Sequence, residues 1–246
     1  MTWAADFWNR LAAGFTRAEG LDAQPWVLAA VAAVAVLLSV PGRTWRWFGL
    51  FVTFVHELGH AFAALTAGRR ITGIELRFDH SGQMRSLGRN GFGAMWAGFW
   101  GYPVPALTGL ALVWAAQTGW ASAALSIGVL VLVAALVFIR NVQGAAIAAA
   151  CAAAAVLLLW FVPQVLAAYV TASLGIALLV GAVRDWLNLV SVHTRRRSAL
   201  QSSDAWILAQ RSNVPSAVWL LLFAVVIGAC TVAAALLLSS AAGLTG

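Results

Sequence analysis

The stretch FVTFVHELGHAFAAL, residues 51–65, places two histidines and a glutamate inside an otherwise apolar run. His56 and His60 are four residues apart, so on a helix both imidazoles project from the same face. That spacing allows two imidazoles to bind one Zn²⁺, with Glu57 beside the metal as a general base. Zinc lowers the pKa of its bound water to about 7, which provides a nucleophile for a carbonyl. Ionisable groups at the centre of a membrane helix cost roughly 2.5–3.5 kcal/mol each, so we interpret these three as functional.

The composition is that of an integral membrane protein. Of the 246 residues, 62% are hydrophobic and 9% are charged, whereas soluble domains are about 25% charged. The net charge of +7 comes from fifteen arginines set against eight acidic residues. These arginines lie at the ends of apolar runs, where they fix membrane topology, and the chain has no basic domain that would bind nucleic acid. We therefore expect a lipid bilayer, and no nucleic acid, as its partner.

Seven apolar segments have the length of membrane-spanning helices, which need about 20 residues. They cover residues 26–41, 46–67, 93–116, 121–139, 144–162, 164–187 and 216–239. Pro103 and Pro105 predict a kink near the start of the third segment. The predicted fold class is an all-α polytopic membrane protein with about seven transmembrane helices.

The arginines also predict an orientation in the cell membrane. With the N-terminus in the cytoplasm and seven crossings, Arg43 and Arg46 fall outside and the other thirteen arginines fall inside. Cytoplasmic loops carry an excess of basic residues, so we predict this orientation for a multi-pass protein. It places the C-terminus outside.

The chain divides into a short N-terminal segment and one larger domain. Within residues 1–24, Trp3, Phe7, Leu11 and Phe15 recur every four residues, which is typical of a helix lying in the membrane interface. A frayed terminus is an equally good interpretation of this segment. Residues 25–240 are predicted to form a single membrane-embedded domain.

Two polar stretches interrupt that domain on the predicted cytoplasmic side. In residues 71–87, Ile74 and Leu76 alternate with polar residues and DHSG follows, which predicts a small β-hairpin at the membrane face. Its edge at Ile74 would be free to pair with an extended peptide. Residues 188–214 are predicted to form a cytoplasmic loop in which Ser203 or Asp204 caps a short helix.

The order of these features resembles a known family. HELGH in a membrane helix, then a hairpin, then a helix with AG followed by proline is similar to the site-2 protease family of intramembrane zinc metalloproteases. The layout resembles a compact bacterial subgroup without a PDZ domain, and FIRNVQG (138–144) and SDAWILAQRSNVPSAVW (203–219) resemble segments of that subgroup. The resemblance implies that His56 and His60 bind zinc, that Glu57 is the catalytic base, and that the substrate is a transmembrane protein.

The third zinc ligand departs from the family pattern. Site-2 proteases take it from an aspartate in a Leu-Asp-Gly turn, which this sequence lacks. By resemblance Asp204 is the first candidate, although a helix cap explains it equally well. Asp185 is the alternative, unless it pairs with Arg184. Asn141 comes third, and because an amide is a poor zinc ligand we favour a substrate or backbone contact for it.

Three function classes follow from these residues. The predicted function is hydrolysis of peptide bonds in membrane-spanning substrates. The missing Leu-Asp-Gly turn leaves open a non-proteolytic scaffold that keeps the fold, although such a scaffold has no need of Glu57. A metal or proton transporter is the third class, but transporters place ionisable groups on several helices of repeated halves.

Overall fold

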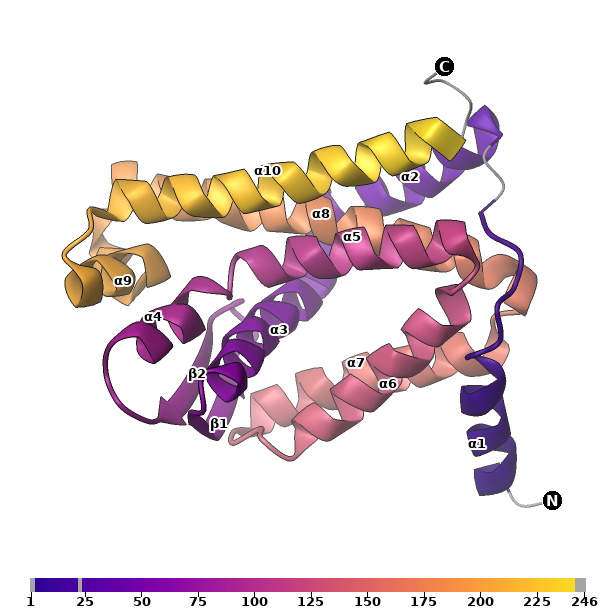
Figure 1. The fold of residues 1–246 in the computed structure, drawn as a ribbon, viewed down its shortest axis with the longest axis horizontal. Coiled ribbons are helices and arrows are strands. Elements are labelled where there is room, and N and C mark those ends of the chain that lie inside the picture. Colours follow the sequence, from indigo (N-terminus) through magenta and orange to yellow (C-terminus); the bar gives the residue numbers. More distant parts are fainter. Residues whose placement is uncertain (1–2, 22–23, 242–246) are drawn as a thin grey trace.

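The computed structural model describes residues 3–21 and 24–241, and it is mostly helical (Figure 1). Its elements, in chain order, are α1 Trp3–Ala13, α2 Pro25–Ser39, α3 Gly42–Thr66, β1 Arg70–Leu76, β2 Gly82–Leu87, α4 Phe92–Phe99, α5 Pro103–Thr118, α6 Ala121–Leu136, α7 Val142–Phe161, α8 Gln164–Thr194, the 3₁₀ helix η1 Arg197–Ser202, α9 Asp204–Ser212 and α10 Ser216–Ala241.

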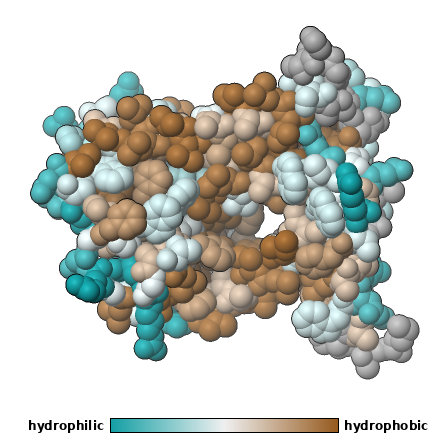
Figure 2. Space-filling view, viewed as in Figure 1, coloured by the Kyte–Doolittle hydropathy of each residue, from teal (hydrophilic) through white to brown (hydrophobic). Residues whose placement is uncertain are grey.

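The long helices make this a multi-pass membrane protein. Four of them, α3, α7, α8 and α10, are each long and apolar enough to cross a bilayer, and α4 with α5 would make a fifth as one broken span. The apolar helices α2 and α6 are shorter. Figure 2 shows hydrophobic residues over the middle of the molecule and hydrophilic residues gathered toward its ends. The predicted count of seven crossings is not confirmed.

A sharp bend separates α4 from α5. The two helix axes differ by 55°, and the break lies directly before Pro103, the first residue of α5. Proline is tolerated at that position because its missing N–H would have no partner in the first turn of a helix. The kink predicted for this segment therefore takes the form of a turn between two helices.

The helix α3 lies between two helical layers (Figure 1). On one side Leu50, Phe54 and Leu58 pack in a cluster with residues of β1, α6 and α7. On the other side Val52 and Val55 contact Leu178 of α8. Both faces of α3 are thus held by packed neighbours, which gives the residues on it a fixed place.

The predicted hairpin is present as an antiparallel pair, β1 with β2. The other edge of β1 is also occupied. The Ile74 N–H donates to the Phe138 carbonyl oxygen at 2.8 Å, and the Ile74 carbonyl oxygen accepts from the Arg140 N–H at 3.0 Å. Asn141 then accepts from the Leu76 N–H and donates to the Leu76 carbonyl oxygen. The free edge expected at Ile74 is therefore wrong, because the segment before α7 covers it.

The hairpin lies along α3 and not beyond its end. At the hairpin tip, His80 Nε2 is 3.1 Å from the Arg46 carbonyl oxygen, and the His80 ring meets Trp45 edge-on. Ile74 and Leu76 on β1 are buried in the cluster that packs on α3. The hairpin is therefore placed more deeply than a hairpin at the membrane face, because its apolar side packs against the helix.

Both ends of the described chain lie at the same end of the bundle (Figure 1). Near the start, Arg17 donates to the Thr118 carbonyl oxygen. Near the finish, Gln117 donates to the Leu237 carbonyl oxygen. Because both contacts involve the last turn of α5, the structure does not support the predicted orientation, in which the two ends of the chain lie on opposite sides.

The path of α2 explains why both ends of the described chain lie at the same end of the bundle. It runs in the same direction as α8, with Ser173 donating to the Val31 carbonyl oxygen and Arg184 donating to the Ser39 carbonyl oxygen. It begins at the end that holds α1 and the last turn of α10, and α3 finishes at the end that holds α4 and α9 (Figure 1). Together α2 and α3 carry the chain once along the bundle, where the sequence predicts two crossings.

Candidate active site

Two consecutive turns of α3 carry His56, Glu57 and His60. The ring centroids of the two histidines are 4.8 Å apart, as their spacing on one helix face requires. Glu57 is 4% exposed and His60 is 7% exposed. Three ionisable side chains are thus concentrated on a part of the helix that is shielded from solvent.

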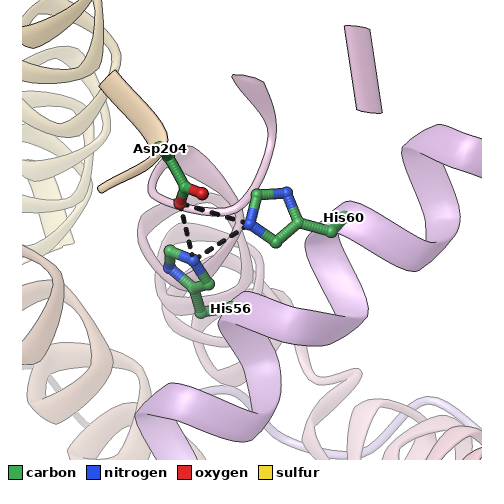
Figure 3. A group of neighbouring side chains, drawn as sticks. All are labelled: His56, His60 and Asp204. Carbon is green, nitrogen blue, oxygen red and sulfur yellow. Dashed lines mark hydrogen bonds and ion pairs between the residues drawn. The ribbon is translucent and has the colours of Figure 1, made fainter. Parts of the chain in front are cut away.

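Asp204 is brought to these histidines by α9. The residue before it, Ser203, caps that helix, since its hydroxyl accepts from the Trp206 N–H. His193 of α8 lies 3.0 Å from the same hydroxyl. The interpretation of Asp204 as the helix cap is therefore wrong, and its carboxyl is left to point away from the helix end toward α3 (Figure 3).

His56, His60 and Asp204 form a compact triangle of ligand-type atoms (Figure 3). His56 Nε2 is 3.2 Å from Asp204 Oδ2 and 3.1 Å from His60 Nε2, and His60 Nε2 is 3.3 Å from Asp204 Oδ2. Asp204 lies 148 residues from His56 in the sequence. Two elements distant in the chain therefore meet at one point through three side chains of metal-binding type.

A model of the Peptidase M50B-like family matches residues 27–234. The chain belongs to this family. The match supports the site-2 protease resemblance drawn from HELGH, and it spans the whole triangle of side chains. No curated protein and no solved structure matches the chain. Membership of the M50B-like family implies an intramembrane metallopeptidase.

The side chains of this M50B-like protein fit a zinc ion. In a tetrahedral site with bonds of about 2.0–2.1 Å, ligand atoms are separated by about 3.3 Å, and the three distances in the triangle agree with that value. Two imidazoles with one carboxylate form a donor set that catalytic zinc sites use, with a fourth position open. Among the residues that the structure describes, this is the one group of histidine, cysteine and acidic side chains that could hold a metal.

The surroundings orient the ligand atoms. His60 Nδ1 lies 2.8 Å from the Ala97 carbonyl oxygen, so Nδ1 carries the hydrogen and Nε2 is left with a lone pair for a metal. In the metal-free protein, burial raises the pKa of the Asp204 carboxyl, but protonated His60 and His56 beside it hold that pKa below its ordinary value. The carboxyl is therefore an anion before a metal binds, and a bound cation would take the place of the imidazolium charges.

Two glycines make room at the site. A Cβ on Gly101, in the turn between α4 and α5, would lie 2.7 Å from His56 Nε2 and even closer to His60 Nε2. A Cβ on Gly82, at the start of β2, would lie 2.5 Å from Glu57 Oε1. The other oxygen of that carboxyl, Oε2, is buried and has no hydrogen-bond partner in the described part of the chain. The space in front of the histidines and the free oxygen of Glu57 both suit a bound ion with its water.

The other two candidates for the third zinc ligand lie outside the triangle. Asp185 is on α8 and is not a member of the triangle, although its charge interacts with His56. Arg184 is hydrogen-bonded to the carbonyl oxygens of Ser39 and Val40. Asn141 makes a backbone contact, one of the two roles expected for it, but the backbone is that of Leu76 in this chain.

Sequence reasoning missed the residues of α4 and of the turn between α4 and α5. Ala97 orients His60 through a main-chain oxygen, and Gly101 acts through a missing side chain, so neither has a recognisable chemical signature. Tyr102, next along, has its ring 4.7 Å from that of His56. The one signal present is the run FWGYP, in which glycine and proline mark a helix break.

Proposed function

We propose that this protein is an intramembrane zinc metallopeptidase that hydrolyses peptide bonds of transmembrane protein substrates. The observation that carries the proposal is the convergence of His56, His60 and Asp204 within 3.3 Å of one another, with Glu57 next to His56 on α3. The family match supports the metallopeptidase class. Zinc is favoured over harder cations because two of the three donors are imidazoles.

Zinc bound there would activate a water molecule and polarise the scissile carbonyl. Glu57 would accept a proton from that water as the water oxygen attacks the carbonyl carbon. It would then donate the proton to the amine nitrogen as the C–N bond breaks. The Glu57 carboxyl suits this exchange, because it is buried and Oε2 is not engaged by any described residue.

A helical substrate must unwind before its scissile carbonyl can be reached, and β2 offers an edge for the unwound segment. Because Ile74 makes its backbone bonds to the segment before α7, Ile74 and Met84 are a non-hydrogen-bonded pair of the hairpin. The backbone N–H and carbonyl of Met84 therefore point away from β1. The Met84 N–H donates to the Glu57 carboxyl, so the Met84 carbonyl oxygen is the group that this edge would offer to a substrate beside the catalytic base.

Two substitutions at one position test the edge. Met84→Pro removes an N–H that also bonds to Glu57, so a fall in kcat alone would report the catalytic base, whereas a rise in KM would report substrate binding at the edge. Met84→Ala keeps the N–H and should cleave normally. Equal activity in the two variants would remove β2 from substrate binding.

Asp204 of the triangle is the first residue of α9, and α9 lies at the same end of the bundle as the hairpin (Figure 1). The arginines of the hairpin, Arg140 and the run Arg195–Arg197 belong to elements at this end, whereas Arg10 and Arg17 contact the other end through Trp160 and Thr118. An excess of basic residues marks the cytoplasmic side. The active site would therefore open toward the cytoplasm, with both ends of the described chain on the outer side.

The function is tested by Glu57→Gln and wild-type protein, both purified in detergent. Zinc content is measured by metal analysis, and cleavage is measured on a model transmembrane helix. We expect the variant to keep zinc and to lose at least about 100-fold in rate, the usual range for a general base. Removal of zinc from the wild type by a chelator should abolish cleavage, and added zinc should restore it.

Zinc bound to wild-type protein that does not cleave, or equal cleavage by wild type and Glu57→Gln, would contradict the proposal. Absence of zinc from both proteins would favour a scaffold that keeps the fold. Ion flux in liposomes that depends on His56 would favour transport.

A further inference from the structure

Tyr102 stands beside the metal triangle, directly after Gly101 in the α4–α5 turn. Its ring meets the His56 ring edge-on, with centroids 4.7 Å apart and planes at 86°. It also stacks on Phe223 of α10 at 5.2 Å and 24°. Contacts to α3 and to α10 together hold the ring in one position next to a candidate zinc ligand.

The Tyr102 hydroxyl is not used by the fold. None of the described residues hydrogen-bonds to it. Its ring lies against the ring of His56, a member of the metal triangle, so the hydroxyl belongs to the immediate neighbourhood of the site. Tyr102 is partly buried, and a tyrosine hydroxyl in such a position normally bonds to a protein group or to water. A donor held here without one is available to a group that the chain does not supply.

We propose that Tyr102 is a further catalytic residue, whose hydroxyl donates a hydrogen bond to the scissile carbonyl oxygen as that oxygen becomes negatively charged. The inference rests on the proposed peptidase function. Donors placed where negative charge develops stabilise the transition state more than the bound substrate. A phenol is suited to this role at neutral pH, because it donates without ionising.

The step balances without a further reactant. Attack by water forms a C–O bond and moves the π electron pair of the carbonyl onto its oxygen, and the water proton passes to Glu57. Tyr102 keeps its own proton and stabilises the charge by hydrogen bonding. When the electron pair returns, the C–N bond breaks and the proton on Glu57 passes to the amine nitrogen. Tyr102 is unchanged at the end.

The test is Tyr102→Phe, which keeps the ring contacts with His56 and Phe223 and removes only the hydroxyl. Tyr169→Phe, on α8 and outside the site, is the matched control, since these are the two tyrosines of the chain. Four quantities are measured for each variant: zinc content, kcat, KM for a model transmembrane helix, and affinity for a phosphinic peptide that mimics the charged tetrahedral state.

For Tyr102→Phe we expect a fall in kcat of about 100-fold or more, the effect of removing one such donor, with zinc content and KM unchanged. Affinity for the phosphinic peptide should fall with kcat, and Tyr169→Phe should match the wild type. A kcat equal to that of the wild type would overturn the inference. Loss of zinc would also overturn it, because the hydroxyl would then serve the metal site and not the reaction.

The inference and the proposed function fail separately. If zinc-loaded wild-type protein does not cleave the helix, the peptidase proposal falls. If it cleaves and Tyr102→Phe cleaves equally well, only the role of Tyr102 falls. Equal affinity of the two proteins for the phosphinic peptide would overturn that role whether or not cleavage is detected.

Discussion

Gly101 lies so close to His56 that a Cβ on it would be 2.7 Å from His56 Nε2. The turn between α4 and α5 is the reason, because the 55° bend brings its backbone over the histidines. The face that the two imidazoles would offer to a metal is open because residue 101 has no side chain.

Gly101→Ala should therefore abolish zinc binding without changing a ligand. The added methyl group would occupy space beside both Nε2 atoms, where it is too close for any normal contact. Zinc content after purification is the measurement. The matched control is Gly228→Ala on α10, since a Cβ there meets nothing within 4 Å. Zinc retained in both variants would contradict this account of the turn.

Gly82→Ala should separate cleavage from metal binding. Its methyl group would collide with Glu57 Oε1, which the added atom would approach to 2.5 Å, and would displace the carboxyl from the reacting atoms. We expect zinc content close to that of the wild type and a loss of at least about 100-fold in kcat, similar to the loss of a general base. A variant that cleaves normally would show that Glu57 does not act from the position seen here.

The two aspartate candidates give a matched pair of substitutions. Asp204→Asn replaces the carboxylate of the triangle by an amide. Loss of a residue that only hydrogen-bonds to a metal ligand lowers metal affinity by roughly 10–100-fold, and loss of the ligand itself should lower zinc affinity by more than that. Asp185→Asn should leave zinc affinity nearly unchanged, because Asp185 is outside the triangle. Affinity is measured by competition with a zinc chelator. The reverse order of effects would assign the third ligand to Asp185.

The sequence predicts those parts of the site that depend on local geometry. Spacing on one helix is enough to bring the His56 and His60 rings together, since a helix fixes that relationship by itself. Asp204 is 148 residues from His56, and no periodicity links them. Asp204 is a candidate only by resemblance. Its carboxyl is available to a metal because Ser203, and not Asp204, caps α9. Gly101 contributes space, which carries no pattern in a single sequence.

The orientation of the chain in the membrane shows a second limit of prediction from the sequence. Hydropathy treats each apolar segment separately, so the run at 26–41 counts as a full crossing. In the fold, α2 is a helix of 15 residues that packs along α8 and leads into α3. Whether two apolar helices make one crossing or two depends on these tertiary contacts, and an error there reverses the side of every residue before α3.

Accessibility of single cysteines tests the corrected orientation. In a background without Cys151 and Cys230, Glu19→Cys and Ser240→Cys introduce thiols at exposed positions near the two chain ends, and Ser198→Cys introduces one at an exposed position before α9. In intact cells a membrane-impermeant maleimide should label the first two and not the third. Labelling of Glu19→Cys and Ser240→Cys from opposite sides would restore the orientation with the two ends apart.

Asn141 provides the last test, because its two expected roles have different consequences. Its amide accepts from the Leu76 N–H at 3.1 Å and donates to the Leu76 carbonyl oxygen at 2.7 Å. Asn141→Ala leaves both part-buried backbone groups without these bonds, so we expect a loss of about 1–3 kcal/mol in the free energy of unfolding. That loss is measured by thermal unfolding in detergent. Gln143→Ala is the control, since its bond to the Phe78 N–H is longer, at 3.4 Å, and exposed. If Asn141 instead contacts the substrate, Asn141→Ala will raise KM while the unfolding temperature stays that of the wild type.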